Sequence, residues 1–256
     1  MNDVKNIAIL TGATGGLGYA FLKELCKEPL DEIWAVGRNA ERLKALTEEF
    51  GSRVIPFKID LTDAEALASF GKIIEERAPH IHMLINNAGI AQMKSSCKLT
   101  LEEINSTIDL NCKAPTILTN ICLPYMGKGD RILNISSASA FQPVPYLNLY
   151  ASTKAYSRSY TRALNAELKP LGVTATAVCP YWIDTDLLIK VINGKKVEFK
   201  GMLTPEKVAK KAMKDAKKGR DMSVCGFHVK CLHANVKFVP QKLTMKIWMK
   251  MIKKYL

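Results

Sequence analysis

The chain has 256 residues, of which 48% are hydrophobic, so a chain that is disordered as a whole is excluded. Its formal net charge of +13 is unevenly placed, because residues 1–186 carry 19 basic and 20 acidic residues, whereas residues 187–256 carry 18 and 4. A neutral body therefore precedes a strongly basic last quarter, which needs an explanation of its own.

Short apolar segments alternate with helical patterns along the whole chain. We expect strands within 7–11, 31–39, 53–63, 81–90, 130–137, 173–180 and 221–226. We expect helices within 19–27, 40–50, 65–78, 101–126, 149–172 and 204–219. The strands are apolar throughout, which is typical of a parallel sheet covered on both faces. The sequence therefore predicts an α/β fold, a doubly wound parallel sheet of about seven strands with helices on both faces, in a single domain over 1–256.

Neither a membrane segment nor a metal site is expected. The opening "MNDVKNIAIL" lacks the pattern of a signal peptide, and no apolar run reaches the ~20 residues of a membrane span. The seven cysteines are odd in number and form no CxxC pair, which favours a reducing cytoplasm over disulfides or a zinc site. The four histidines lack carboxylates at ligand spacing, so no metal is expected.

The stretch "TGATGGLG" stands between the first expected strand and the first helix. Gly12, Gly16 and Gly18 would let the backbone turn tightly and approach a phosphate at the N-terminus of the helix. The spacing TGxxxGxG differs from GxGxxG, and a glycine-rich turn without a ligand is the alternative. After the second strand, Arg38 is suited to a 2′-phosphate, so NADP(H) is preferred over NAD(H). Asp60, after the third, could accept from an adenine amino group. The alternative for Arg38 is a solvated arginine at a helix start, and the alternative for Asp60 is a turn residue.

The pentapeptide "YASTK" places Tyr150 and Lys154 four residues apart, on one face of a helix. A lysine ammonium near a tyrosine favours the phenolate and lowers a pKa that starts at about 10, so the hydroxyl can exchange a proton near neutral pH. Ser137 stands 13 residues earlier, where it could hydrogen-bond the substrate oxygen. Asn111 could hold a water that relays protons through Lys154. Each residue also has an ordinary structural alternative. Taken alone, Tyr150 could be a packed aromatic and Lys154 a solvated helix residue. Ser137 could be a loop hydroxyl, and Asn111 a polar residue inside a helix.

These motifs occur together in an order and spacing that is specific. The stretches are "TGATGGLG", "DLTD", "NNAG" at 86–89, "DLNCKAP" with Asn111, "ILNISS", "YASTK" and "CPYWIDT". Through them the chain resembles the short-chain dehydrogenase/reductase family over essentially its full length. The resemblance implies a Rossmann-type fold and hydride transfer with NADP(H) preferred and NAD(H) also possible. It assigns catalytic roles to Asn111, Ser137, Tyr150 and Lys154.

The resemblance also implies which residues contact the cofactor. "NNAG" would form the floor under the adenosine and the nicotinamide ribose, and its alternative is a simple strand-terminating turn. Ile183 and Thr185 would contact the nicotinamide carboxamide. The expected cofactor-binding residues are Gly12, Thr14, Gly15, Gly16, Leu17, Gly18, Arg38, Asp60, Leu61, Asn87, Ala88, Gly89, Tyr150, Lys154, Pro180, Ile183 and Thr185.

Tyr181 departs from the family, most of which has Pro-Gly where this chain has Pro180 followed by Tyr181. The stretch "PYWIDT" resembles the sequence of one branch of the family, which contains 17β-hydroxysteroid dehydrogenases and very-long-chain 3-ketoacyl-CoA reductases. The N-terminal membrane segments of those relatives are not seen in this sequence, so the resemblance implies a soluble or peripheral protein. Residues 186–203 would form the substrate loop, with an apolar lining made of Leu187, Leu188, Val191 and Ile192. The alternative is a surface helix that these four side chains dock on the domain. The expected substrate contacts are Ser137, Tyr150, Tyr181, Leu187 and Leu188.

The tail, residues 241–256, reads as a basic amphipathic helix. At about 100° per residue, one third of it carries lysines and the opposite side is apolar, although Leu243 interrupts the pattern. The lysines are Lys242, Lys246, Lys250, Lys253 and Lys254, and the apolar residues are Met245, Trp248, Met251, Ile252, Tyr255 and Leu256. Such a helix suits an anionic membrane, but it could equally pack on the domain or a neighbouring subunit, or attract an anionic substrate such as an acyl-CoA or a conjugated sterol. Nucleic acid is not expected, because the lysines carry no groove-reading motif.

The favoured function is an NADP(H)-dependent oxidoreductase that interconverts a ketone and a secondary alcohol on an apolar substrate, hydroxysteroid-like or fatty-acyl-like, in the cytoplasm or at the membrane periphery. One alternative is a 3-oxoacyl-acyl-carrier-protein reductase, although "IAQM" after "NNAG" departs from the Thr-Arg-Asp of such reductases. The other is a non-catalytic NADP(H)-binding or membrane-docking protein. The resemblance implies a homodimer or homotetramer through the long helices around Asn111 and Tyr150.

Overall fold

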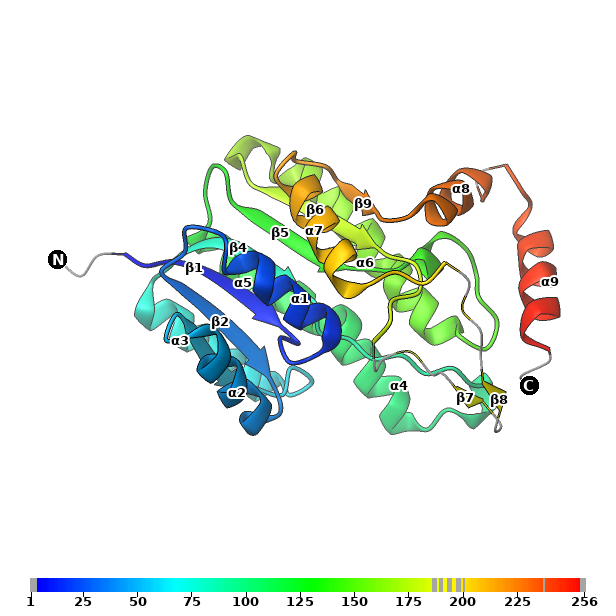
Figure 1. Cartoon of the computed structure of the whole chain (residues 1–256), viewed down its shortest axis with the longest axis horizontal. Helices are drawn as coiled ribbons and strands as arrows, with labels where there is room; N and C mark the ends of the chain where they lie inside the picture. Colours follow the sequence, from blue (N-terminus) through cyan, green and yellow to red (C-terminus); the bar gives the residue numbers. More distant parts are fainter. Residues whose placement is uncertain are drawn as a thin grey trace.

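A seven-stranded sheet forms the centre of the molecule (Figure 1). The computed structural model describes residues 4–185, 188, 191–192, 195–196, 199, 201–236 and 238–253. In sheet order the strands are β3 (Val54–Lys58), β2 (Glu32–Gly37), β1 (Asn6–Thr11), β4 (His80–Asn86), β5 (Arg131–Ile135), β6 (Thr174–Cys179) and β9 (Met222–Val224). Each pair of neighbours is parallel, which confirms the predicted α/β fold.

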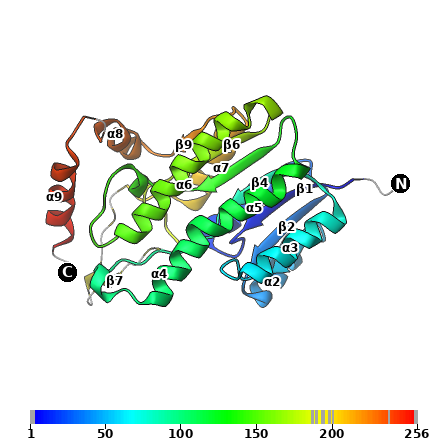
Figure 2. The same cartoon turned by 180° about the vertical axis from the view of Figure 1, so that it is seen from behind.

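Helices cover both faces of this sheet, so the apolar strands are buried from two sides. One core packs the sheet against α1 (Gly16–Leu25), α2 (Ala40–Phe50) and α7 (Pro205–Ala216). The opposite core packs it against α3 (Ala64–Arg77), α5 (Ala114–Cys122) and α6 (Asn148–Glu167). Figures 1 and 2 show these two layers from opposite sides.

The strand order reverses at β1, which pairs with β2 on one side and with β4 on the other. The connections that leave β1 and β4 therefore diverge, and they open a crevice outside the carboxyl ends of the strands. Crevices at such switch points are where doubly wound sheets bind their ligands. The glycine turn and "NNAG" both begin at this point.

The segment 101–126, expected as one long helix, is divided. The structure forms α4 (Leu101–Ile108), a π-helical turn over Asp109–Lys113, then α5, and a 3-10 turn at Leu123–Tyr125. Pro115 has no N–H to give to the carbonyl of Asn111, which explains why the regular ladder cannot run through this point. The π turn therefore contains Asn111, one of the expected catalytic residues.

The last part of the chain lies beyond the carboxyl ends of the strands (Figure 1). Two short strands, β7 (Val191–Ile192) and β8 (Lys195–Lys196), pair antiparallel within the expected substrate loop. Helix α8 (Phe227–Asn235) and helix α9 (Gln241–Ile252) follow β9. No helix among the described residues is long and apolar enough to cross a membrane.

Candidate active site

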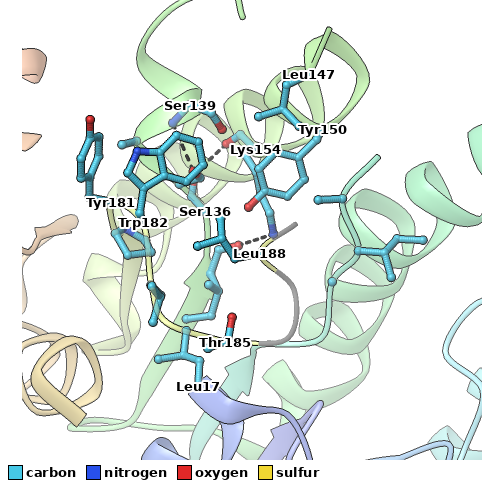
Figure 3. Close-up of a pocket in the computed structure, with 18 of the residues that line it drawn as sticks. Leu17, Ser136, Ser139, Leu147, Tyr150, Lys154, Tyr181, Trp182, Thr185 and Leu188 are labelled. Carbon is cyan, nitrogen blue, oxygen red and sulfur yellow. Dashed lines mark hydrogen bonds between the residues drawn. The ribbon is translucent and has the colours of Figure 1, made fainter. Parts of the chain in front are cut away.

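A cavity of about 1190 Å³ extends from the crevice at the switch point to α9. Every residue of the expected cofactor-binding set lines it. Of the expected substrate contacts, Ser137, Tyr150, Tyr181 and Leu188 also line it, whereas Leu187 lies outside the described residues. Figure 3 shows Tyr150 and Trp182 facing the same space from two sides. The structure therefore brings the expected residues together, and their roles stay predictions.

The glycine turn is held open at the phosphate end of the cavity. Gly12 has a positive φ of 64°, and a Cβ on Gly18 would lie 2.0 Å from the carbonyl oxygen of Gly12. The amide of Asn87 donates to the carbonyl oxygens of Thr11 and Gly12, at 3.0 and 3.1 Å. Gly15 caps α1 without a side-chain hydrogen bond, so N–H groups of the first helical turn are left to bind a phosphate. This cradle fits a dinucleotide.

Two arginines line the end of the cavity near β2, and sequence reasoning found only one of them. Arg38 follows β2, Arg42 lies in the first turn of α2, and both side chains line the cavity. The side chain of Asn39 accepts from the N–H of Arg42 at 2.8 Å and fixes the start of the helix. The position of Arg42 in the first turn of the helix after β2 was the signal that could have identified it. Together they form a cationic end suited to a phosphate.

Asp60 lines the cavity but its carboxylate already has local partners. It accepts from the N–H and the hydroxyl of Thr62, at 2.9 and 2.7 Å. These two hydrogen bonds lower the pKa of Asp60 below its ordinary value. Asp60 is therefore ionised at neutral pH, and it can accept a hydrogen bond only through its remaining lone pairs.

Tyr150 and Lys154 lie one turn apart on α6, as predicted, with the ammonium 5.5 Å from the centre of the ring. Lys154 donates to the carbonyl oxygen of Ile135 at 2.7 Å (Figure 3). Ser137, which follows β5, lines the same cavity as Tyr150. Three side chains from two elements thus meet at one point of the cavity.

The prediction that Lys154 lowers the pKa of Tyr150 is wrong for this structure. Burial raises the pKa of the Tyr150 hydroxyl to about 12, and the nearby Ser137 hydroxyl offsets only part of this effect. Burial also lowers the pKa of Lys154 to about 8, although the thiols of Cys112 and Cys179 act in the opposite direction. At neutral pH, Tyr150 is therefore protonated and most of Lys154 is charged.

Asn111 lies behind the cavity wall rather than in it. Its amide donates to the carbonyl oxygen of Ile90 at 2.9 Å and to Thr153 at 3.0 Å, and its oxygen accepts from the N–H of Ile90 at 3.0 Å. A Cβ on Gly89 would lie 3.1 Å from the Asn111 oxygen and 3.2 Å from the Lys154 nitrogen. Asn111 therefore ties the loop after β4 to α6 next to Lys154.

The substrate end of the cavity is more aromatic than the sequence indicated. Tyr181 packs against the cluster around Phe141, while Trp182 contacts Tyr181, Phe199 and Trp248. Sequence reasoning missed Trp182 and Phe199, because the chain between them has no clear period. In the expected substrate loop, Leu188 and Phe199 line the cavity, Val191 is exposed, and the side chain of Ile192 lies outside the description.

The residues after β6 close over the glycine turn. The carbonyl oxygen of Pro180 accepts from the N–H of Ala138 at 2.8 Å, and Ile183 pairs with Leu203. A Cβ on Gly16 would lie 2.9 Å from the methyl group of Thr185, so Thr185 lies directly over the turn. Ile183 and Thr185 therefore border the phosphate end as well as the substrate end.

Helix α9 folds back over the substrate end. Trp248 donates its indole N–H to the carbonyl oxygen of Pro145 at 2.8 Å and stacks on Trp182 with ring centres 6.5 Å apart. Ile252 is only 4% exposed. Packing on the domain, one of the alternatives for this tail, is thus observed for Trp248 and Ile252, whereas Met251 is exposed. Lys254, Tyr255 and Leu256 lie outside the described residues.

Within the described ranges, no group of His, Cys, Asp or Glu side chains is arranged to hold a metal ion. His80 and His82 instead share one carboxylate, that of Asp130, at 2.8 and 3.0 Å. Asp130 lies 48 residues from His82 in the sequence, so spacing alone could not reveal this partner. The cluster lies at the amino ends of β4 and β5, away from the cavity.

Comparison with known proteins gives matches over most of the chain. The family model described as short chain dehydrogenase matches residues 6–196. A very-long-chain 3-oxoacyl-CoA reductase of Bos taurus is 30% identical over 252 residues, which cover 94% of this chain and 78% of that protein. A serine 3-dehydrogenase of Agrobacterium fabrum is 30% identical over 190 residues, which cover 73% and 76%. A solved short-chain dehydrogenase of Sphingobium yanoikuyae in complex with NADPH is 27% identical, with a TM-score of 0.79 over 93% of this chain and 95% of that chain.

Proposed function

Because this chain belongs to the short-chain dehydrogenase family, an oxidoreductase family, we propose that it reduces an apolar ketone to a secondary alcohol with NADPH. The reverse oxidation and the use of NAD(H) are also open to such a site. One observation carries the proposal: Ser137, Tyr150 and Lys154 meet at one wall of a cavity whose other end is a glycine cradle with two arginines. The Sphingobium relative, which has the same fold, is a complex with NADPH.

NADPH, when bound, supplies the hydride. The hydroxyls of Ser137 and Tyr150 would both donate to the substrate carbonyl oxygen, which polarises it. Because the pKa of Tyr150 is raised to about 12, its hydroxyl is protonated at neutral pH and can protonate the alkoxide as it forms. The Lys154 ammonium would stabilise the negative charge left on the tyrosine. Asn111 would position this lysine through Thr153 and Ile90.

The cradle supports a preference for NADP(H). Arg38 and Arg42 would pair with the 2′-phosphate, and Asp60 would contact the adenine. Thr185 and Ile183 would border the nicotinamide carboxamide. The residues directly after β2 are Arg38 and Asn39, so no carboxylate stands at the position where one would bind the ribose hydroxyls of NAD and repel a 2′-phosphate.

The substrate end supports an apolar substrate. Trp182, Leu188 and Trp248 line it, together with Leu147 and Val144. An acyl chain and a sterol ring system both suit such a wall, and the two curated relatives named above act on a 3-oxoacyl-CoA and on serine according to their names. The apolar wall favours the acyl or sterol class over an amino acid. The 3-oxoacyl-acyl-carrier-protein alternative belongs to the same acyl class.

We also propose the setting in which the chain works. The whole chain, 1–256, would act as one NAD(P)-binding domain, and its seven free cysteines suit a reducing cytoplasm. A homodimer or homotetramer would form through α4, α5 and α6. The exposed side chains of Ile108 and Tyr156 support this, because Tyr156 stacks on Tyr160 and offers an apolar surface there.

The test is NADPH oxidation across a panel of ketosteroids, 3-ketoacyl-CoA thioesters and 3-ketoacyl-carrier-protein thioesters, and NADP reduction with 2-amino-3-hydroxy acids. Turnover of at least one apolar ketone is expected. Tyr150→Phe should lower kcat by about a hundred- to ten-thousand-fold, while NADPH binding measured by fluorescence is kept. Tyr156→Phe on the same helix is the matched control. Unchanged turnover by Tyr150→Phe would refute the mechanism.

A further inference from the structure

Helix α9 turns one side to the domain and leaves an apolar stripe outside. Trp248 and Ile252 pack inward, against Pro145 and the substrate end of the cavity. Leu243, Ile247 and Met251 are spaced by four residues, so they form one stripe along the helix. Their exposed fractions are 49%, 53% and 58%. The domain leaves this apolar stripe of α9 uncovered.

Positive charge borders the same stripe. The lysines of α9 and its C-cap repeat at nearly the same spacing, so they form a second row beside the first: Lys242, Lys246, Lys250 and Lys253. No Asp or Glu occurs after Asp221, and residues 222–256 carry seven lysines. The outward side of α9 therefore consists of an apolar row next to a cationic row. That combination is typical of helices that lie in an anionic lipid interface.

The opening of the cavity lies at this side of α9. Ile247, Met251 and Lys250 line the cavity and are also exposed, so they form part of its rim. Phe238, just before the helix, is 86% exposed. Figures 1 and 2 show α9 at one end of the molecule, clear of both helical layers of the sheet. A flat surface can therefore reach α9 without meeting the body first.

We propose that α9 docks this protein on an anionic lipid bilayer, with the rim of the substrate cavity against the lipid. Leu243, Ile247, Met251 and Phe238 enter the interface, and the lysines pair with anionic headgroups. The substrate is then a ketone dissolved in the bilayer, which reaches the cavity past Ile247 and Met251 without crossing water. The substrate part rests on the proposed function, whereas the docking part does not.

A second copy of the chain fits this surface less well. In a symmetric dimer the same patch meets itself, so the lysine row of one α9 would face that of the other. The rest of the chain has no excess of negative charge to offset this repulsion, because residues 1–221 carry 30 basic and 24 acidic residues. An anionic bilayer complements both rows at once. Charge complementarity therefore selects the bilayer as the partner.

The docking test is co-sedimentation of the full chain with vesicles of phosphatidylcholine alone or mixed with phosphatidylglycerol. We expect binding only to the mixed vesicles, and weaker binding as salt is added. The triple variant Lys242→Gln, Lys246→Gln, Lys253→Gln should bind roughly a hundredfold more weakly at low salt, at about 1 kcal/mol per lysine. The matched control removes the same charge from α7 and the turn that follows it: Lys210→Gln, Lys214→Gln, Lys218→Gln. It should bind like the wild type.

A second variant tests the apolar row with residues outside the cavity lining. Phe238→Ser, Leu243→Ser should bind mixed vesicles at least about tenfold more weakly and keep its turnover of a small water-soluble ketone. When the ketone is dissolved in the vesicles, the turnover rate of this variant should fall in proportion to its loss of vesicle binding. Vesicle binding without turnover of any ketone would refute the proposed function and leave docking standing.

Three results would overturn the docking proposal. The first is a wild type that does not bind mixed vesicles. The second is a loss by the α7 control as large as the loss by the α9 lysine variant, which would indicate a diffuse charge effect. The third is a dimer, detected by light scattering, that the variant Phe238→Ser, Leu243→Ser dissociates without changing vesicle binding. That result would show that the stripe binds a second copy of the chain.

Discussion

The side chain of Asn111 closes a pair of hydrogen bonds with the main chain of Ile90, accepting from its N–H at 3.0 Å and donating to its carbonyl oxygen at 2.9 Å. A third hydrogen bond reaches Thr153, the neighbour of Lys154 on α6. The π turn that carries Asn111 thus fixes the loop after β4 and the helix with the expected catalytic lysine. Its amide has no further N–H to offer, so a water held by this side chain could only donate to the remaining lone pair of its oxygen.

Asn111→Ala should destabilise the fold and slow the reaction together. It leaves the partly buried N–H and carbonyl of Ile90 without their partner, which costs about 1–3 kcal/mol of unfolding free energy. Urea unfolding and steady-state kinetics would measure the two effects. Asn105→Ala, at an exposed position of α4, is the control and should change neither. Equal behaviour of the two variants would show that the pairing with Ile90 is dispensable.

Gly18→Ala should abolish the dinucleotide cradle. The new Cβ would lie 2.0 Å from the carbonyl oxygen of Gly12, so the turn has to move. We expect NADPH binding, measured by fluorescence titration, to weaken at least about a hundredfold, because the phosphate depends on close backbone approach. Gly127→Ala adds a methyl group where nothing lies within 4 Å and should bind NADPH normally. Normal NADPH binding by Gly18→Ala would contradict the assigned cradle.

Arg38→Asp should reverse the cofactor preference. It removes a cation from the expected 2′-phosphate site and adds a carboxylate there, so KM for NADPH should rise by about tenfold to a hundredfold and KM for NADH should fall. Arg42→Ala should raise KM for NADPH alone. Kinetics with both cofactors would measure the ratio. Lys44→Gln, on the same helix, is the control for charge. An unchanged ratio in Arg38→Asp would remove the argument for NADP(H).

The sequence predicted best those features that depend on local order. Apolar runs gave the seven strands, and the four-residue spacing placed Tyr150 and Lys154 on one face of α6. It could not predict contacts between distant segments. Trp182 meets Trp248 across 66 residues only because α9 folds back over the cavity, and no period in the chain signals that return. Burial, likewise a property of the folded state, reversed the expected direction of the pKa of Tyr150.

Asp130→Asn should lower stability, and most clearly at neutral pH. Burial raises the pKa of Asp130, but the hydrogen bonds from His82, Gly127 and His80 outweigh it, so the net pKa is lowered. A lowered carboxyl pKa contributes stability above the unfolded pKa of about 3.9 and loses it as pH falls through the folded value. The unfolding free energy of the variant should therefore be lower than that of the wild type by about 1–3 kcal/mol at pH 7. Urea unfolding as a function of pH should show the two proteins converging in acid. A constant difference down to the lowest pH would contradict the pairing.

The pH dependence of ketone reduction should report Lys154 rather than Tyr150. The pKa of Tyr150 is raised to about 12, so its hydroxyl is protonated across the usual assay range, whereas the pKa of Lys154 is lowered to about 8. The rate kcat/KM should be flat below pH 8 and fall above it as the ammonium is lost. In Lys154→Arg, whose guanidinium stays charged, residual activity should lose this decline. Circular dichroism at each pH excludes unfolding as the cause. A rate that rises from pH 6 to 9, or a decline that Lys154→Arg leaves in place, would show that the lysine charge does not control the step.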